Sequence, residues 1–239
     1  VFPAYDAVMV GAEESCPAYY DYNGSQYWYD QCTSSAGTKF SGYSFYQLYD
    51  NYDAGDGAVY NGEALYGVAE IVTPDGHSFS AGGTAYNLVA TGAGYTYYSS
   101  VLTGSFAYDG PEAAGTWLGS GISPDLTLVG YATEAGNYMN IDGGLSGMGG
   151  QLDTVVFDTV VIFDGALGSA CPTEPGGVIS VRDDVGYWYD VVFDGPADYG
   201  EAAEARLCDG CGAAYFRGEP LGDVCVDFSA LLDWEVAPW

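Results

Sequence analysis

Three aspartates at three-residue intervals form a compact set of candidate metal ligands. Asp50, Asp53 and Asp56 lie in a short segment whose glycines permit tight backbone turns. Calcium prefers oxygen ligands, and such a loop offers three carboxylates together with backbone carbonyls. The spacing differs from that of an EF-hand loop, so a solvated acidic turn is the competing interpretation. The sequence predicts calcium at these three residues and no other cofactor.

The single histidine is the side chain that a conventional acid–base mechanism near neutral pH would require. His77 follows the turn sequence Pro74-Asp75-Gly76, where a surface position is expected. The chain contains no Gly-x-Ser-x-Gly nucleophile elbow and no phosphate-binding or dinucleotide fingerprint. We therefore assign no catalytic residue from the sequence.

Carboxylates and aromatic rings are abundant, with 33 acidic residues, 23 tyrosines and five tryptophans. A glycosidase needs two carboxyl groups across a cleft, and aromatic rings suit sugar stacking. So many acids single out no pair by themselves. The glutamates to inspect first lie in or beside expected strands: Glu63, Glu70, Glu112 and Glu134.

Two copies of the tetrapeptide YWYD, at residues 27–30 and 187–190, each follow a Cys-Pro pair and a glycine. On a strand, alternate side chains point to opposite faces, so the two tyrosines of each copy share one face and the tryptophan takes the other. Whichever face is exposed is a platform for sugars, peptides or another subunit, with core packing as the alternative. The candidate ligand-binding residues are Tyr27, Trp28, Tyr29, Tyr187, Trp188 and Tyr189.

The even number of cysteines predicts disulfide bonds. Cys208-Asp209-Gly210-Cys211 is a CxxC, but a second CxxC for zinc is absent, and Asp209 does not favour a reactive thiolate. If the YWYD segments are duplicated hairpins, the next cysteine after each copy plays the same role. The expected pairs are Cys16 with Cys32, Cys171 with Cys208, and Cys211 with Cys225.

Runs rich in tyrosine, valine, threonine and phenylalanine alternate with turn residues about every ten positions, which predicts strands joined by turns. Residues 154–163 are apolar on both faces, which is typical of a buried central strand. Helical signal is confined to residues 201–207 and, more weakly, 229–234. The predicted class is all-β, an antiparallel, disulfide-stapled β-sandwich or jelly-roll-like pair of sheets with little helix.

The duplicated motif suggests a boundary near residue 170. We expect a larger β-rich domain, residues 1–170, and a smaller disulfide-stapled unit, residues 171–239, with packing as a single domain as the alternative. The hydrophobic content of 48% supports a folded core.

The formal net charge of -29, with four basic side chains, excludes nucleic acid as a partner because too few cations face the phosphates. It also excludes binding to an anionic membrane surface. No stretch approaches the ~20 apolar residues of a membrane span. The cysteines and the absence of a signal-peptide pattern after Val1 predict a secreted or extracytoplasmic cell-surface protein whose signal segment has been removed.

Six stretches of the chain carry a resemblance: residues 208–212, 218–222, 225–228 and 231–235, with residues 108–112 and 180–183 upstream. In these stretches the chain resembles uncharacterised exported proteins of myxobacteria-like bacteria. This resemblance implies an envelope or secreted location and carries over no activity.

Together these features predict a non-catalytic surface protein that acts in adhesion, assembly, or ligand and glycan binding. Its partners are then a glycan, an envelope protein, or further copies of the chain in a homo-oligomer or filament, because sheet edges can pair. The alternative is a carbohydrate-active hydrolase that uses a carboxylate pair in an aromatic cleft.

Overall fold

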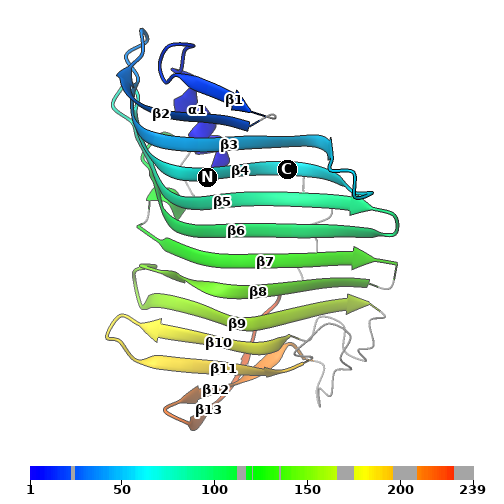
Figure 1. Cartoon of the computed structure of the whole chain (residues 1–239). Coiled ribbons are helices and arrows are strands. Elements are labelled where there is room, and N and C mark those ends of the chain that lie inside the picture. The colour runs from blue at the N-terminus through cyan, green and yellow to red at the C-terminus, as the bar shows by residue number, and fades with distance from the viewer. Residues whose placement is uncertain are drawn as a thin grey trace. The chain divides into compact units, whose positions relative to one another are not determined.

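The computed structural model describes residues 1–22, 25–111, 117–119, 121–134, 136–165, 175–195 and 209–228. It contains the helix α1 (Phe2–Met9), the short 3₁₀ helix η2 (Trp117–Gly119) and thirteen strands (Figure 1). The strands are β1 (Tyr19–Tyr22), β2 (Ser25–Thr33), β3 (Lys39–Asp53), β4 (Val59–Val72), β5 (Ser78–Gly92), β6 (Tyr95–Tyr108), β7 (Ser123–Thr133), β8 (Gly136–Ser146), β9 (Leu152–Gly165), β10 (Gly176–Asp183), β11 (Trp188–Asp194), β12 (Cys211–Phe216) and β13 (Glu219–Cys225).

The strands follow one another in a single 13-stranded sheet in chain order. Neighbouring strands such as β2 and β3, or β10 and β11, pair antiparallel. The predicted all-β antiparallel class is confirmed. The strand order does not give the expected sandwich or jelly roll, which stacks two sheets. Each connection between consecutive strands here places the next strand beside the last, so the sheet grows without a crossover.

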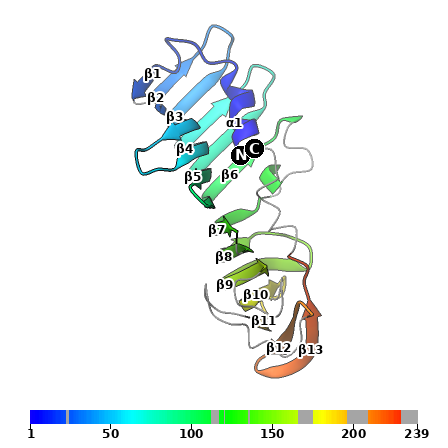
Figure 2. The same cartoon turned by 90° about the vertical axis from the view of Figure 1, so that its right-hand side faces the viewer.

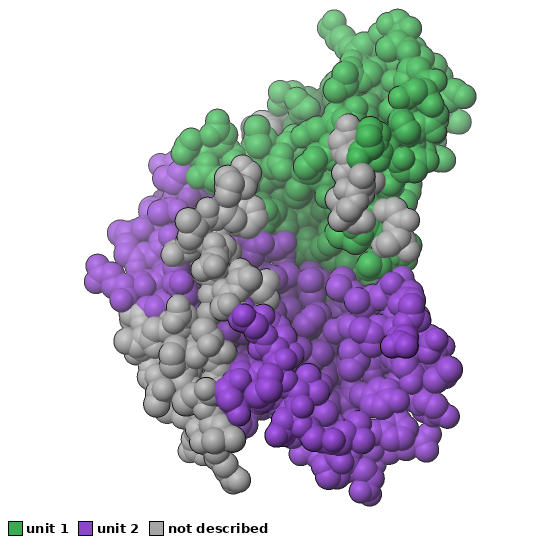
Figure 3. Space-filling model, turned by 180° about the vertical axis from the view of Figure 1, so that it is seen from behind, with its two compact units in different colours: residues 1–52, 61–88, 101–125 green, residues 53–60, 89–100, 126–239 purple. Residues whose placement is uncertain are grey.

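The chain divides into two compact units, each assembled from separate segments (Figure 3). Unit 1 consists of residues 1–52, 61–88 and 101–125, and unit 2 of residues 53–60, 89–100 and 126–239. The five strands from β3 to β7 contribute residues to both units. The boundary expected near residue 170 lies outside the described residues.

Helix α1 covers one face of the sheet of unit 1 (Figure 2). A proline in its first turn suits the helix start, because proline has no backbone N–H to leave unpaired. Ala4, Tyr5 and Val8 are buried, at the three- and four-residue spacing of one helix face. The sequence pattern did not predict this helix. The two helices expected near residues 201–207 and 229–234 lie outside the described residues.

Each unit has its own hydrophobic core. In unit 1 the core includes Trp28, Phe40 and Leu65. In unit 2 the core residues include Met139, Ile141, Val160, Ile162, Val191 and Phe193. The prediction that residues 154–163 are buried throughout holds for residues 160–162, whereas residues 154–157 are half-buried and 158–159 exposed.

Two disulfide bonds lie within the described residues, and both match the predicted pairs. Cys16 is bonded to Cys32, and Cys211 to Cys225. The third expected pair, Cys171 with Cys208, lies outside the described residues. Of the helices in the described part of the chain, none is both long and apolar enough to span a bilayer.

Candidate functional site

The first YWYD copy lies in β2 and is anchored by its tryptophan. Trp28 is 1% exposed, packs edge-on against Phe40, and its indole N–H donates a hydrogen bond to the Tyr5 hydroxyl at 3.2 Å. Because side chains alternate along a strand, Tyr27 and Tyr29 point to the opposite face. We call that face of β1–β4, away from α1, the outer face.

Four aromatic rings lie side by side on the outer face, one from each of four successive strands. Tyr20 of β1 pairs with Tyr27 of β2, and their rings stack with centroids 5.3 Å apart. Tyr27 pairs in turn with Phe45 of β3, whose ring meets that of Tyr66 of β4 edge-on at 5.6 Å. We call these four residues the aromatic row. It runs across the strands rather than along them.

A second pair of rings lies two residues farther along the same strands, about 7 Å from the aromatic row. Tyr29 of β2 is directly opposite Tyr43 of β3. Tyr29 is 80% exposed and Tyr43 is also exposed. We call Tyr29 and Tyr43 the tyrosine pair. Large exposed rings that are not needed for the core are free to contact a ligand.

A polar groove adjoins the tyrosine pair. It measures about 520 Å³ and is lined by residues 31–33 and 39–41 together with Glu70 and Val72. Gln31 and Ser41 are directly opposite each other, one step beyond the tyrosine pair. The groove therefore offers an amide, a hydroxyl, an ammonium and a carboxylate next to two exposed rings.

The outer face carries little charge for so acidic a chain. Among its residues on β2, segment 39–49 of β3 and segment 64–72 of β4, the charged side chains are Lys39 and Glu70. The acids Asp30 and Glu63 belong to the opposite face. There Asp30 accepts a hydrogen bond from the Ala18 amide at 3.1 Å, and Glu63 accepts one from the Tyr46 hydroxyl at 2.7 Å. Burial, reinforced by this bond to Glu63, raises the pKa of Tyr46.

The second YWYD copy turns the other way. Val191 and Phe193 of β11 are in the core of unit 2, so Tyr189 shares their face and Trp188, 44% exposed, points away. Tyr189 stacks on Phe216 at 5.0 Å.

The other tyrosine of this copy is engaged in packing as well. Tyr187 meets Phe216 edge-on, and the Arg217 guanidinium lies 5.3 Å from the centre of the Tyr187 ring. Such cation–π contacts stabilise the ends of neighbouring strands. Ligand binding by Tyr187, Trp188 and Tyr189 stays a prediction.

The three aspartates proposed for calcium make local hydrogen bonds in and beside the β3–β4 connection. An oxygen of Asp53 accepts from the Gly55 amide at 2.7 Å, and Asp50 accepts from the Asn51 side chain at 2.8 Å. The hydrogen bond from the Tyr60 hydroxyl lowers the pKa of Asp56.

These contacts account for the acidic segment as a turn. The described residues contain no group of three or more histidine, cysteine, aspartate or glutamate side chains arranged to hold a metal ion. Calcium at Asp50, Asp53 and Asp56 stays a prediction.

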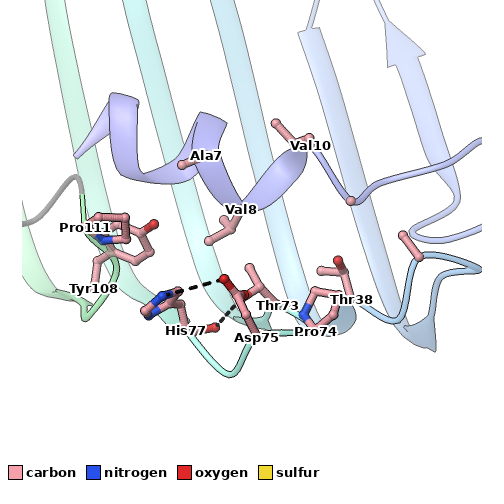
Figure 4. Close-up of a pocket in the computed structure, with 12 residues that line it drawn as sticks. Ala7, Val8, Val10, Thr38, Thr73, Pro74, Asp75, His77, Tyr108 and Pro111 are labelled. Carbon is pink, nitrogen blue, oxygen red and sulfur yellow. Dashed lines mark hydrogen bonds and ion pairs between the residues drawn. The ribbon is translucent and has the colours of Figure 1, made fainter.

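His77 lines a pocket of about 350 Å³ beside α1, together with Asp75 and Tyr108 (Figure 4). Its Nε2 is 3.7 Å from an Asp75 oxygen, and its Nδ1 is 3.6 Å from an Asp109 oxygen. The two carboxylates face different nitrogens of the imidazole ring. A single metal ion therefore cannot be bound by Asp75, Asp109 and one nitrogen of His77 at the same time. Both distances are longer than a hydrogen bond, so these contacts are ion pairs that form only when the imidazole is protonated.

The carboxylates beside His77 are held ionised by their own hydrogen bonds. The Thr73 hydroxyl lowers the pKa of Asp75, and the Ser78 backbone N–H lowers that of Asp109. The arrangement ties the β4–β5 turn to the end of β6.

The three described glutamates that were considered for hydrolysis lie in different places. Glu63 bonds to Tyr46 on the covered face, Glu70 lies in the polar groove on the outer face, and Glu134 lines a pocket of unit 2. Glu112 lies outside the described residues.

Sequence reasoning identified Tyr27 and Tyr29 but missed the partners that neighbouring strands contribute. Those partners are Tyr20, Tyr43, Phe45, Tyr66, Gln31 and Ser41, whereas Glu70 was considered only as a carboxylate for hydrolysis. The signal available was the alternation of aromatic residues in each strand, but the register between strands was needed to join them.

Comparison with protein-family models, curated proteins and solved structures finds no match to the chain.

Proposed function

We propose that this chain is a non-catalytic, secreted or cell-surface glycan-binding protein, and that the outer face of β1–β4 holds the sugar. The observation that carries the proposal is the order in which three features lie on that face. The aromatic row is followed by the tyrosine pair, and the tyrosine pair by the polar groove.

This order suits a pyranose ring. One side of such a ring is a set of C–H groups that packs on an aromatic face, while its hydroxyls project from the edge. Tyrosine offers a large contact area at low entropic cost. A sugar on Tyr29 and Tyr43 has Gln31 and Ser41 about 7 Å along the strands, where hydrogen bonds to its hydroxyls can form.

The charges favour a neutral glycan. Lys39 and Glu70 balance each other on the outer face, so neither an acidic nor a basic sugar gains a net opposite charge there. The chain as a whole, at -29, repels acidic polysaccharides.

The number of carboxylates in the groove favours sugar binding over sugar hydrolysis as the function. A glycosidase places two carboxyl groups within about 5 to 9.5 Å of each other across the scissile bond. In the described part of the chain, the groove beside the tyrosine pair presents Glu70 alone. The two disulfide bonds support an exported protein, since such bonds persist in oxidising compartments.

The test is the substitution Tyr29→Ala, with Tyr29→Phe as the matched control. Tyr29 is mostly exposed, so its removal leaves the fold intact, and circular dichroism checks this. Truncating a central aromatic contact costs about 1–2 kcal/mol, or roughly five- to thirtyfold in affinity. We expect that weakening in calorimetric titrations with the neutral hexasaccharides of cellulose, xylan and laminarin. Tyr29→Phe keeps the ring and is expected to retain the affinity.

Two results would contradict the proposal. One is a wild-type chain that binds none of these oligosaccharides and is not retained on the corresponding insoluble polysaccharides. The other is a Tyr29→Ala/Tyr43→Ala variant that binds as tightly as the wild type.

A further inference from the structure

A second row of aromatic rings lies in unit 2. Tyr97 of β6, Tyr131 of β7 and Tyr138 of β8 follow one another on three successive strands. The ring centroids of Tyr97 and Tyr131 are 4.9 Å apart, and those of Tyr131 and Tyr138 are 6.2 Å apart. The next residue along the chain from each of the three is buried in the core of unit 2: Tyr98, Ala132 and Met139. By alternation the three tyrosines lie on the face away from that core.

A pocket of about 250 Å³ lies at the ends of β6 and β7 nearest this row, where Tyr95 and Thr133 of its lining are two residues from Tyr97 and Tyr131. Its lining includes Tyr95, three threonines and one carboxylate, that of Glu134. The threonines are Thr91, Thr96 and Thr133. Tyr95, Tyr131 and Glu134 are all exposed. Unit 2 thus repeats the combination found on the outer face of unit 1, in which a row of rings is followed by hydroxyl groups and a single carboxylate.

We propose that Tyr97, Tyr131 and Tyr138, with the threonine-lined pocket beside them, form a second binding site for a neutral glycan. This inference rests on the proposed function and extends it from one site to two. Sequence reasoning gave no sign of it, because the three tyrosines come from different strands and share no motif.

The chemistry of the row favours an uncharged ligand. No lysine or arginine lines the pocket, so it offers no cation to an acidic sugar. Burial, together with the neighbouring phenols of Tyr97 and Tyr95, raises the pKa of Tyr131, so this central ring of the row stays neutral at physiological pH. Phenol and threonine hydroxyls donate and accept hydrogen bonds, as sugar hydroxyls do.

Two sites on one chain change how it binds a polymer. A polysaccharide with many repeats can occupy both, so retention on an insoluble polysaccharide exceeds the affinity for a short oligosaccharide. Losing either site then weakens retention more steeply than it weakens oligosaccharide binding.

The test is the stoichiometry of binding to the full chain, measured by calorimetry with whichever neutral hexasaccharide binds the wild type. We expect two equivalents for the wild type, one for Tyr131→Ala, one for Tyr29→Ala/Tyr43→Ala, and none when all three substitutions are combined. Tyr131→Phe keeps the ring and is expected to retain both equivalents. Tyr138→Ala serves as a second variant should Tyr131→Ala fail to fold.

The outcomes separate this inference from the proposed function. One equivalent in the wild type, kept in Tyr131→Ala and lost in Tyr29→Ala/Tyr43→Ala, overturns the second site and leaves the first intact. No binding by the wild type removes both. Loss of one equivalent in Tyr131→Ala alone, with the other kept, supports two independent sites.

Discussion

Replacing Tyr5 by phenylalanine removes one oxygen atom from the junction between α1 and the sheet of unit 1. That oxygen accepts hydrogen bonds from the Trp28 indole at 3.2 Å and from the Ser44 hydroxyl at 3.1 Å. All three residues are buried. Burial raises the pKa of Tyr5, so its hydroxyl is neutral at physiological pH.

The expected cost follows from the two donors left behind. A buried donor without a partner costs about 1–3 kcal/mol. The Ser44 hydroxyl can rotate, so its share is at the lower end, and the indole N–H cannot. We expect Tyr5→Phe to lower the free energy of opening of unit 1 by about 2–4 kcal/mol. Ser44→Ala alone leaves no orphaned donor and costs about 1 kcal/mol.

Native-state hydrogen exchange of residues 25–47 in urea measures this free energy directly. In the Tyr5→Phe background, a further Ser44→Ala change is expected to be neutral or stabilising, because it removes an unpaired hydroxyl. A Tyr5→Phe chain whose protection of residues 25–47 stays within about 0.5 kcal/mol of the wild type would refute the reasoning. It would mean that the Tyr5 oxygen does not hold α1 against β2 and β3.

Two further predictions concern the frame of unit 1. A Cβ added at Gly42 would lie 2.1 Å from the Val68 carbonyl oxygen at φ +100°, whereas Gly55, at φ +80°, has open space around it. In urea unfolding, Gly42→Ala is therefore expected to lower the free energy of unfolding more than Gly55→Ala does. The cost of Gly55→Ala is backbone strain alone, about 1–2 kcal/mol. Equal losses for the two variants would contradict the close approach of the backbone at Gly42. The second prediction follows from the lowered pKa of Asp109 in the folded state. Its stabilising contribution is complete above the unfolded value of 3.8 and is lost as the pH falls through the lower folded value, so melting temperatures of wild type and Asp109→Ala are expected to differ at pH 6 and converge towards pH 2.5. A difference in melting temperature that does not narrow as the pH falls would contradict this prediction.

Local properties of the chain were readable from the sequence. Strand content follows from the alternation of β-branched and aromatic residues with turn residues. The Cys16–Cys32 pair follows from its place around the first YWYD copy, and the Cys211–Cys225 pair from the two cysteines that remain once each copy has its pair. The separation of Trp28 from Tyr27 and Tyr29 onto opposite faces follows from the two-residue period of a strand.

The two-residue period does not decide which of those faces is buried, and the two YWYD copies bury opposite faces. In β2 the helix α1 covers the tryptophan side, whereas in β11 the core of unit 2 covers the side of Tyr189. The same four residues therefore bury the tryptophan in one copy, where Trp28 is 1% exposed, and expose it in the other, where Trp188 is 44% exposed. The period of a strand carries no information about what packs against it.

The single sheet and both aromatic rows were likewise decided by tertiary structure. A sandwich and a continuous sheet are built from the same alternating strands and differ in how the connections place them. Tyr20, Tyr27, Phe45 and Tyr66 meet because of the register across three strand pairs, and shifting one strand by one residue would turn its ring to the covered face. The sequence by itself determined which side chains share a face of each strand. Only backbone pairing between strands, and the burial of one face by α1 or the core, decided which of them meet and which reach solvent.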